Sequence, residues 1–215
     1  MTATGAKPTK LKMAMRFLIG ALAGAARTIL FIELVGKPHL DFDDRGTMLA
    51  LIAGLIYALL GLSVGLGALA PRQGAAFLNV EDADEIREQR GSLAPSAISC
   101  ILIGAFLLLL AMAPGLEQAA GREIVVAAAL ICVAGIVAIS FATRGRADEL
   151  MRQVGLEASA FTLHVALAVL SVWALLAHLD YVSWVGPLEL IAGLALLELC
   201  AIFYLGGKRG LMKPR

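Results

Sequence analysis

The strongest constraint on this chain is a series of long apolar runs that carry almost no charge. A helix that spans a bilayer needs about 20 mostly apolar residues. Five runs reach that length, at 47–70, 93–113, 124–143, 158–177 and 181–207. A sixth run, 17–35, is long enough but contains Arg27 and Glu33. The chain is 60% hydrophobic and 16% charged, whereas soluble domains are roughly 45–50% apolar and about 25% charged. The sequence therefore predicts an all-α membrane protein.

The distribution of basic residues indicates six spans. If 17–35 crosses the membrane, Arg27 lies inside it, and Lys37, Arg45 and Arg122 lie on one side. All the others of the 18 Lys and Arg residues share the opposite side, which the positive-inside rule assigns to the cytoplasm. We therefore expect a polytopic transmembrane helical bundle of six spans in three hairpins. We place it in the bacterial inner membrane with both termini cytoplasmic.

A repeated charged segment indicates an internal duplication. Residues 83–86 and 147–150 share the pattern Ala-Asp-Glu-(Ile/Leu), and in both copies a Gln follows three residues later. The offset between the copies is 64 residues. We expect repeat units 83–146 and 147–210, which form the second and third hairpins of a single membrane domain covering 1–215. Because each unit contains two spans, the units should run parallel in the membrane.

The two copies are expected to differ in shape. After 147 the apolar residues follow a helical period into the next span, so we expect one continuous helix there. After 83, the residues Gly91, Ser92 and Pro95 interrupt the pattern, so we expect a short helix followed by a turn. Together the two charged segments form a candidate cytoplasmic docking surface. Its candidate residues are Asp84, Glu85, Asp148, Glu149 and Arg152.

Ionisable residues inside spans are functional candidates, because each costs roughly 2.5–3.5 kcal/mol near the bilayer centre. The intramembrane candidates are Arg27, His164, Glu189 and Glu198. Counting at about 1.5 Å per residue puts Arg27 at a depth similar to Glu189, and His164 at a depth similar to Glu198. Each pair is therefore within reach. A structural ion pair or hydrogen bond and a solute or proton pathway remain alternative interpretations of these residues.

The segment Gly61-Leu62-Ser63-Val64-Gly65 matches the G-x-S-x-G pattern of serine nucleophiles. The same glycines form a Gly-x-x-x-Gly motif, which lets membrane helices pack closely. With six spans, a G-x-S motif and His164 on another span, the chain resembles intramembrane serine proteases of the rhomboid type. It departs from them in carrying Ser63 on the second span. We expect helix packing from this motif, with an intramembrane hydrolase at Ser63 as a lower-ranked alternative.

No motif in the sequence indicates a cofactor, a metal site or nucleic-acid binding. The net charge is +1, which gives no reason to expect a nucleic-acid partner. The three cysteines lie inside apolar runs, where Cys behaves as a small hydrophobic residue. We therefore expect no cofactor and no metal. The expected partners are the lipid bilayer and either another membrane protein or further copies of the chain.

The leading hypothesis from the sequence is a non-enzymatic scaffold or accessory subunit that docks a partner at its cytoplasmic face. Charge is concentrated there in repeated form, whereas the spans contain few polar groups for a translocation path. The alternative is a small-solute or proton-coupled transporter that uses Glu198, His164 and Arg27. A common cavity for these three side chains would favour transport.

Overall fold

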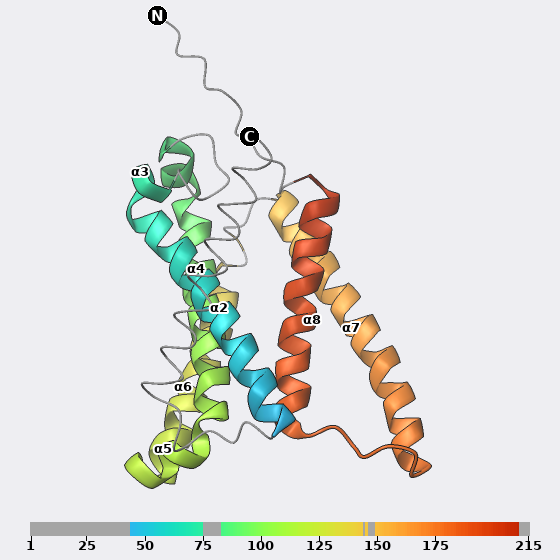
Figure 1. The fold of residues 1–215 in the computed structure, drawn as a ribbon. Coiled ribbons are helices and arrows are strands. Elements are labelled where there is room, and N and C mark those ends of the chain that lie inside the picture. The colour runs from blue at the N-terminus through green and yellow to red at the C-terminus, as the bar shows by residue number, and fades with distance from the viewer. Residues whose placement is uncertain (1–43, 75–82, 144, 146–148, 211–215) are drawn as a thin grey trace, which may run out of the picture. The chain divides into compact units, whose positions relative to one another are not determined.

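The structure is a computed structural model that describes residues 44–74, 83–143, 145 and 149–210. The chain divides into two compact units, Met1–Leu40 and Asp41–Arg215, and every described residue belongs to the second. The described residues form helices and contain no strand. The helices are α2 (Arg45–Leu69), α3 (Pro71–Gly74), α4 (Ala83–Ala111), α5 (Ala113–Ala120), α6 (Arg122–Thr143), α7 (Glu149–His178) and α8 (Pro187–Lys208) (Figure 1).

Five of these helices are long and apolar enough to cross a membrane. They are α2, α4 from Ile86 onward, α6, α7 and α8. They coincide with the five predicted spans that carry little charge, so the prediction of a helical membrane protein is confirmed at this level. The predicted span 17–35, with Arg27, lies outside the described residues. The count of six spans and their arrangement in three hairpins therefore stay predictions.

Local sequence explains where α2 begins and ends. At its start, Asp44 Oδ2 accepts hydrogen bonds from the backbone N–H and the hydroxyl of Thr47, both at 2.7 Å. Such an N-cap satisfies a backbone donor that has no partner within the helix. At the other end, Ala70 precedes Pro71 and has left the helical region, with φ −121° and ψ 74°. A residue before proline is sterically disfavoured in the α conformation, so α2 ends at Leu69.

Proline and glycine shift two of the predicted span boundaries. The last span was expected from 181, but α8 begins at Pro187. Proline suits the first helical turn, and Glu189 Oε2 accepts the backbone N–H of Gly186 at 2.9 Å. The second of the low-charge spans was expected to continue to residue 113. Instead α4 ends at Ala111, and Pro114 lies in the first turn of the short helix α5.

Helix α4 contradicts the expected break after residue 83. It is a single helix from Ala83 to Ala111 and passes through Pro95. Because Pro95 has no N–H, the carbonyl of Gly91 loses its helical donor. Nearby, the hydroxyls of Ser92 and Ser96 donate to the carbonyls one turn earlier, each at 2.9 Å. Neither hydroxyl bonds to the carbonyl of Gly91. Membrane helices tolerate proline where a neighbouring helix packs against them, as α2 packs on α4. The continuous helix expected in the second copy is confirmed from Glu149 onward, as α7.

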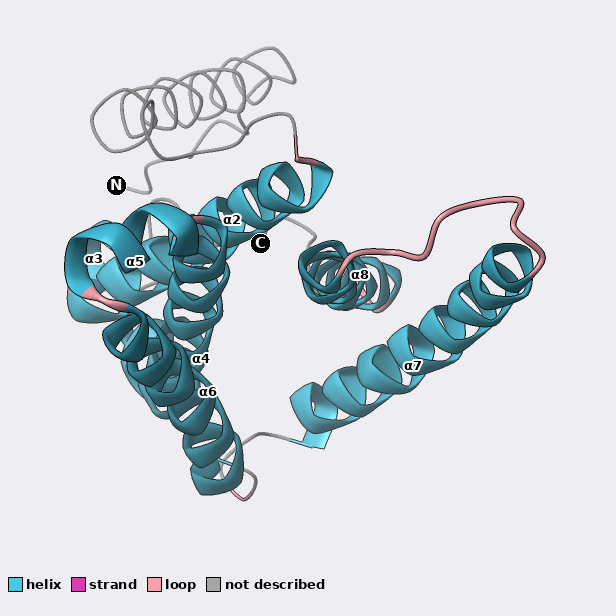
Figure 2. Ribbon diagram, turned by 90° about the horizontal axis from the view of Figure 1, so that it is seen from below, coloured by secondary structure: helices cyan, strands magenta, loops and turns pink. Residues whose placement is uncertain are grey.

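The five long helices pack in the order α6, α4, α2, α8, α7 (Figure 2). The most extensive contact joins α2 to α4, and glycines make it possible. A Cβ atom on Gly104 would lie 2.6 Å from the backbone N of Ala58, and one on Gly61 would lie 2.7 Å from the carbonyl O of Ala97. Neither position has room for a side chain. Of the two glycines around Ser63, Gly61 therefore serves close packing on α4, whereas a Cβ on Gly65 would lie an ordinary 3.6 Å from Ala97 Cβ.

The helix bounds agree with the 64-residue offset, but the packing of the two units differs. Shifted by that offset, α4 covers 147–175 and α6 covers 186–207, close to the bounds of α7 and α8. However, α4 packs extensively on α2, whereas α7 makes its main contacts with α8. The internal repeat, with units 83–146 and 147–210, stays a prediction.

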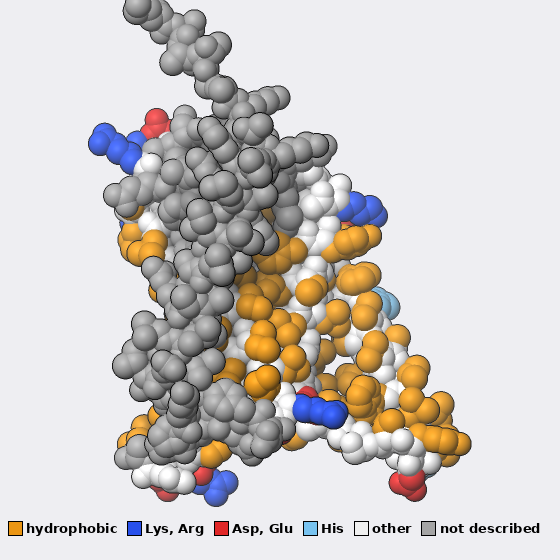
Figure 3. Space-filling view, in the orientation of Figure 1, with side chains coloured by type: hydrophobic (Ala, Val, Ile, Leu, Met, Phe, Trp, Pro, Cys, Tyr) orange, Lys and Arg blue, Asp and Glu red, His pale blue; other side chains and the backbone are white. Residues whose placement is uncertain are grey.

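Charged residues of the described helices gather at two ends. The starts of α2 and α6 carry Arg45 and Arg122. The opposite end, called here the basic end, carries Arg72, Arg87, Arg90, Arg152, Lys208 and Arg209. Between the ends, exposed apolar side chains cover much of the visible face of α7 and α8 (Figure 3). A bilayer is the solvent that suits such a surface. By the positive-inside rule the basic end is predicted to be cytoplasmic.

Candidate functional site

A pocket of about 570 Å³ lies between α2, α4, α6 and α8. This volume falls within the roughly 300–1,000 Å³ of small-molecule sites. Its polar lining residues are Tyr57 from α2, Ser92, Ser96, Ser99 and Cys100 from α4, Ser140 and Thr143 from α6, and Glu198 from α8. Polar side chains from four helices therefore line one pocket, and because Ser92, Ser96 and Ser140 are exposed, this pocket is open to the surroundings.

Helix α4 supplies a stripe of serines to this pocket. Ser92, Ser96 and Ser99 are spaced by four and then three residues, which puts them on one face of a helix. Gly91 and Pro95 line the same pocket. The sequence contained this signal as regular serine spacing. It was missed because serine changes the hydropathy of an apolar run very little.

Most hydroxyl groups of the pocket already donate their proton to a backbone carbonyl. The donors are Tyr57, Ser92, Ser96, Ser140 and Thr143, and the donor–acceptor distances run from 2.7 to 2.9 Å. Tyr57 reaches furthest, because its hydroxyl on α2 donates to the carbonyl of Ala195 on α8 at 2.7 Å. A hydroxyl has one proton and two lone pairs. These five groups therefore offer the pocket oxygen acceptors rather than donors.

Glu198 is the one carboxylate among the described residues that line this pocket. Its side chain is only partly buried, and its Oε1 accepts a hydrogen bond from the hydroxyl of Ser159 at 3.0 Å. Ser159 belongs to α7, so α7 orients a carboxylate that α8 carries. Acidic residues within membrane spans are rare, and those that occur commonly mark solute or ion pathways.

The other intramembrane candidates lie elsewhere. His164 is exposed, and its Nδ1 is 2.6 Å from the carbonyl O of Ala160 in its own helix. His164 and Glu198, which were within reach of each other by depth, bond to different partners, because Glu198 accepts from Ser159 and His164 contacts Ala160. Glu189 caps the start of α8 and lines a second, apolar pocket of about 310 Å³ between α7 and α8. Arg27 lies outside the described residues, so its pairing with Glu189 stays a prediction.

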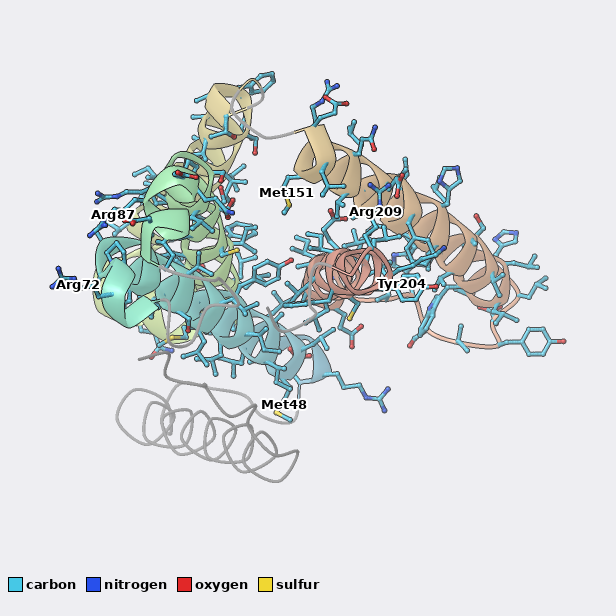
Figure 4. All side chains as sticks on the ribbon, turned by 90° about the horizontal axis from the view of Figure 1, so that it is seen from above. Met48, Arg72, Arg87, Met151, Tyr204 and Arg209 are labelled. Atoms are coloured by element: carbon cyan, nitrogen blue, oxygen red, sulfur yellow. The ribbon has the colours of Figure 1, made fainter. Side chains whose placement is uncertain are left out.

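Polar and aromatic side chains join α7 to α8 near the basic end. Arg209, the residue that follows α8, forms an ion pair with Glu157 of α7. The rings of Tyr204 and Phe161 stack with centroids 6.3 Å apart, and Figure 4 shows Tyr204 and Arg209 directed toward α7. In α7, Glu157 and Phe161 lie two residues before and two residues after Ser159, and their partners Tyr204 and Arg209 follow Glu198 in the chain. These contacts therefore help to fix the position of Ser159 relative to Glu198.

The predicted docking residues that the structure describes are paired within their own helices. Asp84 forms an ion pair with Arg87 in α4, and Glu149 pairs with Arg152 in α7 at 2.9 Å. All four side chains are exposed, and Arg87 points outward in Figure 4. Exposed ion pairs of this kind add little stability. Asp148 and the side chain of Glu85 lie outside the described part, and docking by this surface stays a prediction.

The hydrolase alternative receives no support from local geometry. Ser63 Oγ donates to the carbonyl of Leu59 at 2.7 Å and lies within the continuous helix α2. A serine nucleophile elbow requires a strand–turn–helix context. Ser63 and His164 are not hydrogen-bonded to each other, because each bonds to a carbonyl of its own helix. Within the described residues, no group of three or more His, Cys, Asp or Glu side chains is placed to hold a metal ion.

Three comparisons with known proteins gave no match to this chain. No protein-family model matches it. The curated proteins and the solved structures likewise contain no match. Function therefore has to be inferred from the chemistry of the pocket around Glu198.

Proposed function

We propose that this protein is a membrane-embedded, proton-coupled carrier that binds a small solute in the pocket between α2, α4, α6 and α8. The observation that supports the proposal is Glu198, a carboxylate that lines a cavity of about 570 Å³ together with a set of hydroxyl groups. In hydrocarbon each unpartnered polar group costs several kcal/mol. The cavity combines mainly apolar walls with this carboxylate and several hydroxyl groups, a lining that suits a small solute with both polar and apolar parts.

Glu198 is the group that exchanges a proton in this proposal. The other titratable side chains that line the pocket are Tyr57 and Cys100, which are ordinarily neutral at pH 7. Cys200, on the same helix as Glu198, also lies near Tyr57. Further toward the basic end, the ion pair of Glu157 and Arg209 already balances its own charge. A carboxylate that binds either a proton or a solute couples the movements of the two.

The location of the pocket suggests the side from which a solute enters. Ser92 lies near the start of α4, and Ser140 and Thr143 lie at the end of α6. These are the helix halves nearest the basic end, which is predicted to be cytoplasmic. A carrier must also expose its site to the other side. Because α7 rests mainly on α8 and contacts Glu198 through Ser159, a shift of α7 is the movement we expect to uncover the carboxylate.

The carrier ranks above the scaffold hypothesis because of this pocket. The scaffold depends on the charged segments at the basic end, where Asp84 and Glu149 already form helix-internal ion pairs. Docking and a non-enzymatic role stay predictions. Co-purification of a partner in mild detergent, lost in an Asp148→Ala/Glu149→Ala variant, would support docking instead.

Solute-driven proton flux in proteoliposomes tests the carrier. Liposomes with a pH-sensitive dye inside receive the purified full-length protein, and a panel of amines, amino acids, sugars and carboxylates is added to them. We expect at least one class to drive proton movement in the wild type and in His164→Ala, and not in Glu198→Gln. Glu189→Gln is the matched control, because it makes the same change on α8 outside this pocket. If no class drives flux, or if Glu198→Gln retains full flux, the carrier built on Glu198 is wrong.

A further inference from the structure

We infer that the solute is an organic cation, with an ammonium group that carries N–H donors and an apolar body. The inference rests on the proposed function and narrows its substrate class. It follows from three properties of the pocket, which are the hydrogen-bonding capacity of its polar groups, the sign of its charge, and its size and apolar walls.

The hydrogen-bonding capacity of the pocket is biased toward acceptors. Five hydroxyl groups have donated their protons to backbone carbonyls and retain lone pairs. Because Pro95 lacks an N–H, the carbonyl of Gly91 is also without its helical donor, and both residues line the pocket. Among the described polar lining residues, Ser99 and Cys100 are the ones that keep a proton to offer. A ligand rich in N–H donors matches this pocket, and a ligand made only of acceptors does not.

The charge of the pocket also favours a cationic ligand. Glu198 is its carboxylate, and the described lining residues include no Lys, Arg or His. The nearest basic residues in the sequence of α4, Arg87 and Arg90, are exposed. In a medium of low dielectric constant, a carboxylate and an anion repel strongly and a carboxylate and an ammonium attract. A bound ammonium would also give the partly buried carboxylate of Glu198 a partner of opposite charge.

The size of the pocket favours an organic cation over a bare metal ion. A hard metal ion needs several oxygen ligands at about 2.0–2.6 Å, whereas about 570 Å³ has room for a drug-sized molecule. The walls include Leu60, Val64, Ile202 and Phe203, which can contact an apolar body. An aromatic ring such as that of Phe203 also attracts a cation placed over its face.

Three probes of one shape and different charge test this inference. They are 1-naphthylmethylammonium, 1-naphthylmethanol and 1-naphthoate, and their intrinsic fluorescence reports binding to the purified full-length protein in detergent. We expect the ammonium to bind roughly 10- to 100-fold more tightly than the alcohol, as for a hydrogen bond to a charged group, and the anion to bind more weakly than either. The N,N,N-trimethyl derivative of the ammonium keeps the charge without N–H donors and should bind more weakly than the parent ammonium.

Variants locate the binding site of the probes. Glu198→Gln should reduce the affinity for the ammonium to that for the alcohol, Glu198→Asp should retain most of it, and Glu189→Gln should leave it unchanged. The Asp variant also shows that a loss in the Gln variant reflects charge rather than misfolding. Equal affinity for all three probes, stronger binding of the anion, or unchanged ammonium binding in Glu198→Gln would overturn the inference. If Glu198-dependent proton flux then appears with a neutral or anionic solute, the carrier proposal is supported and only the inference of a cationic solute is wrong.

Discussion

The α2–α4 contact and the α7–α8 contact differ in how they are built. Between α2 and α4 the backbones touch, because a Cβ on Gly104 would lie 2.6 Å from the backbone of α2. Between α7 and α8 the contacts are made by side chains, including the Ser159–Glu198 hydrogen bond and the Glu157–Arg209 ion pair. Helices α7 and α8 also line an apolar pocket of about 310 Å³.

This difference assigns different roles to the two contacts. Backbone contacts through glycine hold α2 and α4 in one relative position, because neither helix can shift without losing its contact with the other. Side chains can change rotamer and re-form contacts in another register. We therefore interpret α2 and α4 as the fixed wall of the Glu198 pocket and α7 as its adjustable neighbour. If α4 and α7 come from a duplicated hairpin, the two copies have taken different mechanical roles.

The largest effect is expected for Gly104→Ala. The added Cβ would meet backbone atoms of Ala58 and Gly54 at 2.6 and 2.7 Å, and backbone cannot yield as a flexible side chain does. We expect the free energy of unfolding in detergent to fall by about 3 kcal/mol, the upper end for an overpacked site. Gly193→Ala on α8 is the matched control, since no heavy atom lies within 4 Å of its added Cβ. The Gly193→Ala variant should be neutral or stabilised by up to about 1 kcal/mol. Equal losses of stability in both variants would mean that the α2–α4 contact is no more closely packed than the α7–α8 contact.

A smaller effect is expected when the hydrogen bond between α7 and α8 is removed. Ser159→Ala deletes the donor to Glu198, and we expect a loss of about 1 kcal/mol in the free energy of unfolding. Backbone amides of α7 should also exchange hydrogen faster, while those of α2 keep their rates. Ser171→Ala changes an exposed serine of the same helix and should alter neither quantity. Faster exchange in α2 would mean that the two contacts are not independent.

The ion pair between Glu157 and Arg209 should contribute less still. The side chains are 51% and 26% exposed, so water and salt screen their attraction. A double-mutant cycle with Glu157→Gln and Arg209→Gln should give a coupling of about 0.5 kcal/mol at low salt. The coupling should shrink as the salt concentration rises. A coupling that is large and independent of salt would show that α7 is fixed to α8 as firmly as α2 is to α4.

The smallest effect concerns the cap of α2. The hydroxyl of Thr47, followed by its backbone N–H, holds the pKa of Asp44 below the ordinary value of 3.8. Because the folded pKa is the lower one, the stabilisation is complete above 3.8 and is lost as the pH falls through the folded pKa. Thermal unfolding measured from about pH 6 downward should therefore show an acid decrease in the wild type that is shallower in Asp44→Asn. Identical pH profiles would mean that this cap does not stabilise α2.

The spans could be predicted from the sequence because hydropathy depends only on which residues a segment contains. The runs around 47–70 and 124–143 correspond closely to α2 and α6. The continuity of α4 through Pro95 could not be predicted in this way. The helix is continuous where it packs against α2, and that packing is not visible in composition. For the same reason the contact partner of Gly61 required the structure.

The candidate site was predicted in part. Glu198 was identified from its charge inside a span, but depth along a helix does not say which face a residue occupies. His164 matched Glu198 in depth, yet it lies about 140° around α7 from Ser159, the residue that contacts Glu198. The serines of α4 were overlooked because they carry no charge. Their role depends on which hydroxyls have already donated their protons, and that follows only from the folded backbone.

The native Cys100 allows the most direct test of an accessible pocket that selects cations through Glu198. Cys100 lines the pocket, whereas Cys132 and Cys200 are not among its lining residues. In a protein with Cys132→Ala and Cys200→Ala, the rates of modification by a cationic and an anionic methanethiosulfonate reagent are measured at low salt. Both reagents attack the same thiolate, so the ratio of their rates reports local charge rather than thiol reactivity.

We expect the cationic reagent to be favoured roughly tenfold or more over the ratio found for a free thiol in solution. Glu198→Gln should abolish that preference, and Glu189→Gln should leave it intact. A ratio equal to that of a free thiol, a preference unchanged in Glu198→Gln, or a Cys100 that neither reagent modifies would contradict an accessible, cation-selective pocket at Glu198.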